Sequence, residues 1–113
     1  MADQVTMKIP FQKDLGDGMR SHVMFMEVTG LKVGSFLVHK KIRPSDLKWS
    51  VTHINTGYRV TSSPEKHSAI VAAERLEEIA DWSFDDPKAV KSWDAEIIEQ
   101  VGMIGDIARV GGV

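Results

Sequence analysis

The spacing of the hydrophobic residues changes near residue 61, and this change divides the chain into two structural halves. Before it, apolar residues alternate with a period of two, as in β-strands; after it they recur every three or four residues, as in α-helices. The net charge changes at the same place. Residues 1–61 carry nine Lys or Arg against five Asp or Glu, whereas residues 62–113 carry five against eleven. The sequence therefore predicts a basic sheet followed by acidic helices.

The first half contains three or four segments with strand periodicity, separated by turn residues. These segments are residues 21–28, 35–42, 48–54 and 58–61. Before them, residues 1–20 contain Pro10 and a Gly-Asp-Gly turn, so we expect an N-terminal arm or a short edge strand there. Short turns favour antiparallel pairing of neighbouring segments. A three- to four-stranded antiparallel sheet is therefore predicted at residues 21–61.

The second half, residues 62–110, predicts two helices. Ser62 with Glu65 matches a capping box, and Ser63 before Pro64 matches an N-cap followed by proline, so either pair can start the first helix. The first helix has an apolar stripe formed by Ala69, Ile70, Ala72, Ala73, Leu76, Ile79 and Ala80. The second helix is expected after an Asp-Asp-Pro cap, with apolar positions at Val90, Trp93, Ile97, Val101 and Ile104.

Together these elements predict one α+β domain spanning residues 1–113, with two C-terminal helices after the sheet. The first helix is expected to cover one face of the sheet. The predicted contacts on this face join Phe36, Val38, Trp49, Val51 and Val60 to Ala69, Ala73, Leu76 and Ile79, or the opposite strand faces make these contacts if the register is shifted by one. The opposite face would stay uncovered and carry Met24, Met26 and Ile54, and an exposed apolar face favours a homodimer.

The composition excludes several classes of protein. The chain has no cysteine, which excludes disulfides, a thiolate nucleophile and cysteine-based metal sites. No uncharged run approaches the roughly 20 residues of a membrane span, and the first residues lack the features of a secretory signal. We therefore expect a cytoplasmic protein that does not enter a membrane.

No motif in the chain indicates catalysis or a cofactor. The four histidines, His22, His39, His53 and His67, lack the close spacing of metal ligands, although His39 and His53 lie on successive predicted strands. No nucleophile motif accompanies them, and the glycines match no phosphate-binding loop. We expect neither an enzyme nor a bound metal or cofactor, and we assign no catalytic residue.

The acidic helices provide the first candidate surface. Two aromatic residues lie among the acids, at the predicted corner between the helices, where they resemble the anchor of a protein interface. The candidate partner-binding residues are Glu74, Glu77, Glu78, Asp81, Trp82, Phe84 and Asp85. As a functional surface, the acids could imitate a phosphate track or dock on a basic partner. Two alternatives remain open: the acids form an ordinary solvated helix face, and the aromatic residues fill the core at the corner.

The basic half provides the second candidate surface, a predicted hairpin whose cations could contact phosphates. The candidate nucleic-acid-binding residues are Lys40, Lys41, Arg43, Lys48 and Arg59. Trp49 or Tyr58 could offer a stacking face for an unpaired base. The alternative is a solvated hairpin whose lysines protect an edge strand from pairing with other chains.

Residues 36–41 and 49–60 form a V-H…W-x-V-T-H-x-x-T-G hairpin pattern followed by an alanine-rich helix. The pattern resembles that of small uncharacterised phage and prophage proteins. The resemblance implies an accessory protein of a mobile element, which binds and blocks a host protein or handles nucleic acid. It carries over no site residue. The sequence thus predicts a non-enzymatic interaction protein, for example an inhibitor, with nucleic-acid binding as the alternative function.

Overall fold

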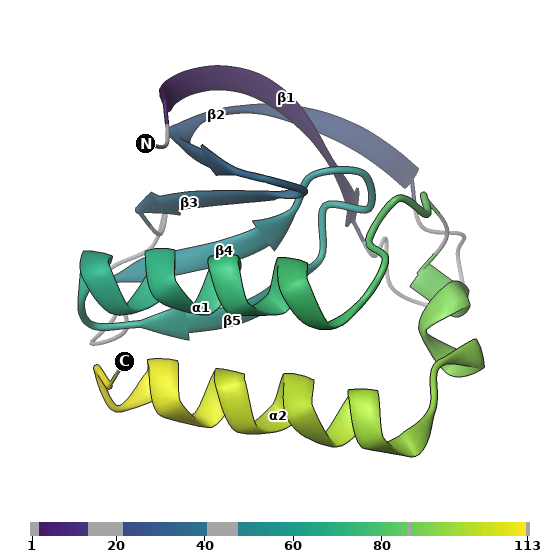
Figure 1. Ribbon diagram of the computed structural model, residues 1–113. Coiled ribbons are helices and arrows are strands. Elements are labelled where there is room, and N and C mark those ends of the chain that lie inside the picture. Colours follow the sequence, from purple (N-terminus) through teal and green to yellow (C-terminus); the bar gives the residue numbers. More distant parts are fainter. Residues whose placement is uncertain (1–2, 14–21, 41–47, 86, 113) are drawn as a thin grey trace.

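The computed structural model describes residues 3–13, 22–40, 48–85 and 87–112 (Figure 1). A five-stranded antiparallel sheet is followed by two α-helices that a 3-10 helix connects. In chain order the elements are β1 (Asp3–Lys13), β2 (His22–Val33), β3 (Phe36–Lys40), β4 (Trp49–His53), β5 (Arg59–Ser63), α1 (Lys66–Ile79), η1 (Pro87–Ser92) and α2 (Ala95–Arg109). The predicted α+β class, with two C-terminal helices after the sheet, is confirmed.

The strands follow one another across the sheet in the order β1-β2-β3-β4-β5. The expected N-terminal arm is in fact a full strand, because β1 pairs with β2 from Asp3 opposite Lys32 to Lys13 opposite His22. Pro10 concealed this strand in the sequence, since proline lacks the N–H that a central strand needs. An edge strand tolerates proline on its unpaired side, and β1 is an edge strand.

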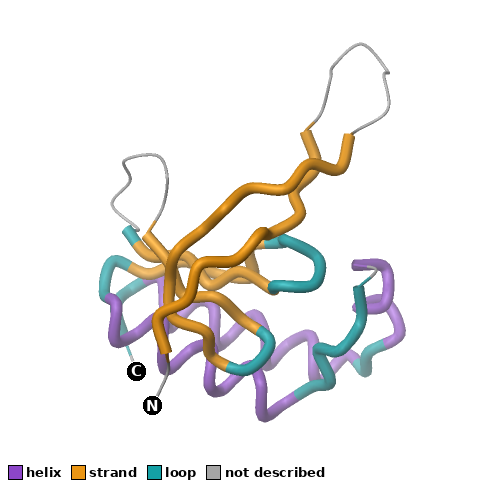
Figure 2. Tube along the Cα trace, turned by 90° about the horizontal axis from the view of Figure 1, so that it is seen from above, coloured by secondary structure: helices purple, strands orange, loops and turns teal. Residues whose placement is uncertain are grey.

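Strand β2 gains β3 as a second partner directly after Gly30, which lies between two of the predicted strand segments. Only Leu31, Lys32 and Val33 pair with β3, whereas the rest of β2 pairs with β1 alone. A Cβ atom on Gly30 would overlap the Val38 carbonyl oxygen and lie 2.8 Å from His39 Cβ. Glycine thus lets β2 cross directly over β3. Figure 2 shows the β1–β2 hairpin running on the side of the sheet that faces away from the helices.

The second face of the sheet is buried at β3, β4 and β5, which corrects the expectation of an uncovered face. The buried side chains on this face are Leu37, His39, Ser50, Thr52 and Ser62. Met26 and Ile54, expected on that face, are half-buried, and the side chain of Met24 lies outside the described residues. The homodimer therefore loses the argument that favoured it and stays a prediction.

Helix α1 covers the first face of the sheet, and the predicted contacts are confirmed. One buried cluster joins Phe36, Val38 and Val51 of the sheet to Ala69, Ala73 and Leu76 of α1, and Trp49, Val60 and Ile79 pack against it. The small alanines let the helix axis lie close to the strands. Among the described residues, none of the helices has the length and hydrophobicity needed to cross a membrane.

The start of α1 differs from the predicted capping box. Ser62 and Ser63 are the last residues of β5, and the helix begins at Lys66 with Glu65 at the N-cap, where no side chain caps the helix. The Ser63 hydroxyl accepts a hydrogen bond from the Glu65 N–H at 3.1 Å. The serines therefore shape the turn before the helix instead of capping it, because pairing with β4 keeps them in the sheet.

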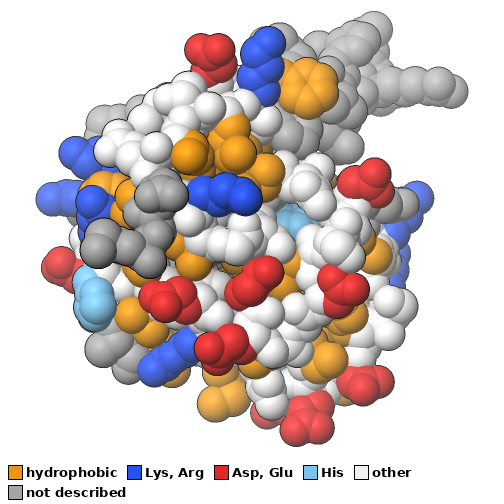
Figure 3. All heavy atoms as spheres, turned by 45° about the horizontal axis from the view of Figure 1, so that its top comes forward, with side chains coloured by type: hydrophobic (Ala, Val, Ile, Leu, Met, Phe, Trp, Pro, Cys, Tyr) orange, Lys and Arg blue, Asp and Glu red, His pale blue; other side chains and the backbone are white. Residues whose placement is uncertain are grey.

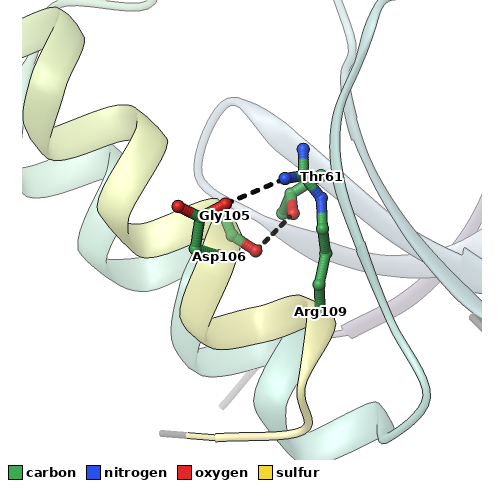
Figure 4. Close-up of polar contacts among 4 residues, drawn as sticks. All are labelled: Thr61, Gly105, Asp106 and Arg109. Atoms are coloured by element: carbon green, nitrogen blue, oxygen red, sulfur yellow. Dashed lines mark hydrogen bonds and ion pairs between the residues drawn. The ribbon is translucent and has the colours of Figure 1, made fainter.

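The region predicted as a single second helix is divided. Pro87–Ser92 forms the 3-10 helix η1, and α2 begins only at Ala95, so Val90 and Trp93 precede the helix that was to contain them. Helix α2 lies against β5 and α1. At the contact with β5, the Thr61 hydroxyl donates a hydrogen bond of 3.2 Å to the Gly105 carbonyl oxygen (Figure 4). An exposed ion pair between Arg109 and Asp106, 2.9 Å long, lies nearby and adds little stability.

Candidate functional site

Five aromatic rings form a cluster where β3, β4, the α1–η1 connection and the segment after η1 meet. Trp82 lies at its centre, edge-to-face with Phe36 at 4.7 Å and with Trp93 at 4.8 Å between ring centroids. His53 lies 4.8 Å from Phe84 and 5.5 Å from Trp82. Edge-to-face pairs stabilise a cluster beyond the area they bury. The connection between the helices is therefore fixed on the sheet.

His53 links this cluster to the β4–β5 loop. Its side chain is only 1 % exposed, yet both ring nitrogens have partners: Nε2 lies 2.7 Å from the Trp82 carbonyl oxygen and Nδ1 lies 2.8 Å from Thr56 Oγ1. A carbonyl oxygen can only accept, so the Nε2–H donates to Trp82, and in the neutral imidazole Nδ1 accepts from the Thr56 hydroxyl. This arrangement assigns a structural role to the histidine and the threonine of the T-H-x-x-T-G pattern.

The loop that follows His53 also contacts the connection between the helices. The Asn55 side-chain amide donates to the carbonyl oxygens of Ser83 and Phe84, each at 3.3 Å. The Tyr58 N–H donates to Thr56 Oγ1 at 3.2 Å. These bonds hold the loop and the Trp82–Phe84 segment in one arrangement, and they place Tyr58 and Phe84 at the mouth of a cavity.

This cavity, the aromatic pocket, has a volume of about 600 Å³ and lies between β5, η1 and α2. Its lining consists of His53, Thr56, Tyr58, Val60, Trp82, Phe84, Lys88, Val90, Lys91, Trp93 and Val101. Most of these side chains are aromatic or aliphatic, and Tyr58, at the mouth, is 52 % exposed. A pocket of this volume and character is typical of a binding site.

Two lysines of η1 contribute to the described lining of the aromatic pocket. Lys88 and Lys91 of η1 line the pocket and are exposed, whereas no carboxylate is found among its described lining residues. This is notable because the C-terminal half of the chain is acidic. The pocket thus combines an apolar interior with an exposed cation, Lys91, at its rim.

The structure separates the predicted partner-binding residues into two groups. Trp82 is 4 % exposed, and its Nε1–H donates to the Leu76 carbonyl oxygen at 2.6 Å, so the core interpretation of this residue is confirmed. Phe84 is half-buried and lines the aromatic pocket. The five acidic candidates, Glu74, Glu77, Glu78, Asp81 and Asp85, are exposed, and Figure 3 shows Asp and Glu side chains gathered over the front of the molecule.

Two of these acids have partners within the chain. The Glu77 carboxylate accepts hydrogen bonds from the Ser35 N–H at 3.0 Å and the Ser35 hydroxyl at 3.1 Å, which ties α1 to the β2–β3 turn. The Asp81 carboxylate accepts a bond from the Ser83 N–H at 3.0 Å, and the hydroxyl and N–H of Ser83 hold the pKa of Asp81 below its usual value. Both acids thus contribute to local structure.

The predicted nucleic-acid-binding residues are only partly brought together. Lys41 and Arg43 lie outside the described residues. Lys40 lies opposite Trp49 in the pairing of β3 with β4, and its ammonium group is 5.7 Å from the centroid of the Trp49 ring. Lys48 is exposed next to Trp49, whereas Arg59 is exposed on β5.

His39 and His53 are not cross-strand neighbours, because His39 pairs with Ser50 and His53 with Phe36. His39 is buried on the second face of the sheet, where Nδ1 lies 2.9 Å from the Lys40 carbonyl oxygen and Nε2 lies 2.7 Å from Thr52 Oγ1. Burial lowers the pKa of His39, and the bond to the Lys40 carbonyl opposes this shift. Within the described ranges, no three His, Asp or Glu side chains could hold a metal ion.

Sequence reasoning missed several residues of the site. Trp93, Val90 and Val101 were predicted as helix core, and their spacing gave no sign that they line a cavity. The Asp-Asp-Pro sequence offered a signal, because a proline-initiated 3-10 turn displaces the following residues from a regular helix face. Lys66 was not considered part of the basic surface, although its ammonium group lies 5.4 Å from the Trp49 ring centroid.

Comparison of the chain with known protein families, with curated proteins and with solved structures found no match.

Proposed function

We propose that this chain is a non-enzymatic interaction protein whose aromatic pocket receives an apolar side chain of a protein partner. The pocket itself is the observation that supports this proposal. It has a volume of about 600 Å³, its walls are mainly aromatic and aliphatic, and it lies beside the helix connection that the sequence marked as an interface. Buried aromatic contacts are the usual source of affinity in protein interfaces.

The geometry of His53 favours binding over catalysis. A general base needs a nitrogen that can take a proton from the substrate. In His53, the Nε2–H is engaged by the Trp82 carbonyl oxygen, and Nδ1 already accepts the Thr56 hydroxyl proton in a hydrogen bond. His53, the one imidazole among the described lining residues, therefore stabilises the pocket wall.

The charges at the rim define the chemistry of the partner. Lys91, an exposed cation of η1, lies in the pocket lining. A partner segment that places Asp or Glu beside an aromatic or long aliphatic side chain would match both the interior and the rim. The nearby acidic surface of α1 would at the same time disfavour a strongly acidic partner outside this segment.

If the resemblance to phage proteins holds, the partner is a host protein. The chain would then be an accessory protein that modulates this partner as an inhibitor. This part of the proposal depends on the V-H…W-x-V-T-H-x-x-T-G pattern. The pocket proposal is independent of it, because it follows from the shape and charge of the site.

The experiment is a pull-down from the lysate of the source cell or its host, treated with nuclease, with four tagged variants beside the original chain. Val101→Phe fills the pocket, and Lys91→Glu reverses one charge at its rim. Ile98→Phe and Arg75→Glu are the matched controls, since both residues are exposed and neither lines the pocket.

We expect one protein to be captured by the original chain and by both controls, and to be lost with Val101→Phe and Lys91→Glu. The captured protein should contain an apolar side chain flanked by acidic residues in the bound segment. Capture that both pocket variants retain would show that the interface lies elsewhere, and the proposal would then fail.

A further inference from the structure

A second depression lies on the side of the sheet that α1 covers, away from the aromatic pocket. It consists of two adjoining hollows of about 330 Å³ and 530 Å³, and both are lined by Leu31 and Lys66. The first extends to Trp49, and the second follows β2 towards the β2–β3 turn. We name the two hollows together the Trp49 groove.

Trp49 carries two ammonium groups within cation–π distance. Lys40 Nζ lies 5.7 Å and Lys66 Nζ 5.4 Å from the ring centroid. The lysines come from different elements, since Lys40 is the cross-strand partner of Trp49 and Lys66 is the first residue of α1. Within the part of the chain that the structure describes, neither ammonium group forms an ion pair with a carboxylate.

The groove has a positive balance of charge. Its lining contains three lysines, Lys32, Lys40 and Lys66, and two acids, Glu27 and Glu74. Lys48, which precedes Trp49, adds a further exposed cation. At the left edge of the view in Figure 3, Lys or Arg side chains lie around hydrophobic side chains. A ligand of this site therefore needs both negative charge and an apolar, stackable surface.

We propose that the Trp49 groove binds single-stranded nucleic acid, with a base against the half-buried indole of Trp49 and phosphates on Lys40 and Lys66. An unpaired base exposes its face, which an indole can stack on, whereas a duplex buries its bases. The partly buried apolar side chains of Leu31 and Ile70 continue the groove beyond the indole and suit neighbouring bases. This site goes beyond the protein interface proposed above, because the two cavities share no lining residue.

The test is fluorescence anisotropy of a labelled oligothymidylate of about 12 nucleotides, titrated with the full chain at about 50 mM salt. Lys66→Glu and Lys40→Glu should each weaken binding at least tenfold. Lys91→Glu is the matched control, because it makes the same charge change at the other cavity, and it should weaken binding less than threefold. The logarithm of the binding constant should fall with the logarithm of salt concentration with a slope of about −1.4, as expected for two phosphate contacts to a single strand.

Stacking is tested separately at Trp49. Trp49→Leu removes the aromatic face and should weaken binding at least fivefold, whereas Trp49→Tyr should retain most of it. Thermal unfolding of each variant shows whether it is folded. If Lys66→Glu does not fold, Lys66→Gln takes its place, with a loss of at least threefold expected.

Three results would overturn the proposal. The first is no change in anisotropy at about 100 μM of the original chain and about 50 mM salt. The second is an equal loss with Lys66→Glu and Lys91→Glu, which would reduce the effect to net charge. The third is equal affinity for duplex DNA, which would remove the role of the indole.

Discussion

Replacing Trp82 with alanine tests whether the helix connection is held on the sheet by the core, as the structure indicates. The indole is 4 % exposed, contacts Phe36 and Trp93 edge-to-face, and donates its N–H to the Leu76 carbonyl oxygen. Truncating a buried tryptophan to alanine typically lowers the free energy of unfolding by about 3 to 5 kcal/mol, and we expect a loss of about 4 kcal/mol for Trp82→Ala. The aromatic pocket adjoins the site, so water can enter part of the new space and the upper end of this range is not expected.

Two further variants separate the contributions to this loss. Trp82→Phe keeps an aromatic ring but removes the N–H, which leaves the buried Leu76 carbonyl oxygen without its partner and should cost about 1 to 2 kcal/mol. Tyr58→Ala changes an aromatic side chain at the mouth of the same pocket that is 52 % exposed, and it should cost less than about 1 kcal/mol.

The assay is urea unfolding followed by far-ultraviolet circular dichroism. With a slope of about 1.5 kcal/mol per molar urea, a loss of 4 kcal/mol moves the midpoint down by roughly 2 to 3 M. The reasoning would be refuted if Trp82→Ala moved the midpoint no more than Tyr58→Ala does. Such a result would mean that Trp82 is a surface residue in solution and that the acidic corner is the interface anchor.

Two other predictions concern the sheet. Gly30→Ala should destabilise the protein by about 2 kcal/mol or more, because the new Cβ would overlap the Val38 carbonyl oxygen. Its control, Gly102→Ala on α2, places the Cβ in open space and should stabilise the protein by about 0.5 to 1 kcal/mol. The urea midpoints of the two variants compare these effects directly, and equal midpoints would contradict the crossing of β2 over β3. His39 has a lowered pKa in the folded chain, so below about pH 6.5 the unfolded chain binds more protons and the free energy of unfolding falls as the pH falls. Measured between pH 7.5 and 5, this loss should be smaller in His39→Gln, and an equal loss in both proteins would argue against the buried site.

The sequence predicted the parts of the fold that depend on local periodicity. Alternation placed Phe36, Val38 and Val51 on one strand face, and the alanine stripe of α1 was assigned to cover it, as the core cluster confirms. Strand β1 was underestimated because its pairing with β2 depends on long-range register, and its own residues include Pro10. A single sequence gives no direct signal of such pairing.

The second face of the sheet was misjudged for a related physical reason. His39, Ser50 and Thr52 have the polarity of exposed strand positions, yet they are buried. Their burial accompanies the crossing of β2 over β3 at Gly30, which the sequence could only mark as a flexible residue. The Thr52 hydroxyl satisfies His39, so these polar groups tolerate burial.

The candidate site was predicted in part. The corner at Trp82 and Phe84 was identified from aromatic residues among acids, and the structure places the aromatic pocket there. The rest of the lining comes from β5, η1 and α2, which only the tertiary fold brings together. The place of Lys91 in the lining was hidden in the sequence by the net negative charge of its half.

The measurement that tests the central claim most directly is site-specific photo-crosslinking in lysate. A benzophenone amino acid replaces Tyr58 at the mouth of the aromatic pocket or, in the control, Ile98, which is 47 % exposed on α2 and does not line the pocket. The account predicts a crosslink from position 58, and not from position 98, to a segment of one protein that contains an apolar side chain beside acidic residues. A crosslink from position 98 alone, or equal crosslinks from both positions, would contradict it.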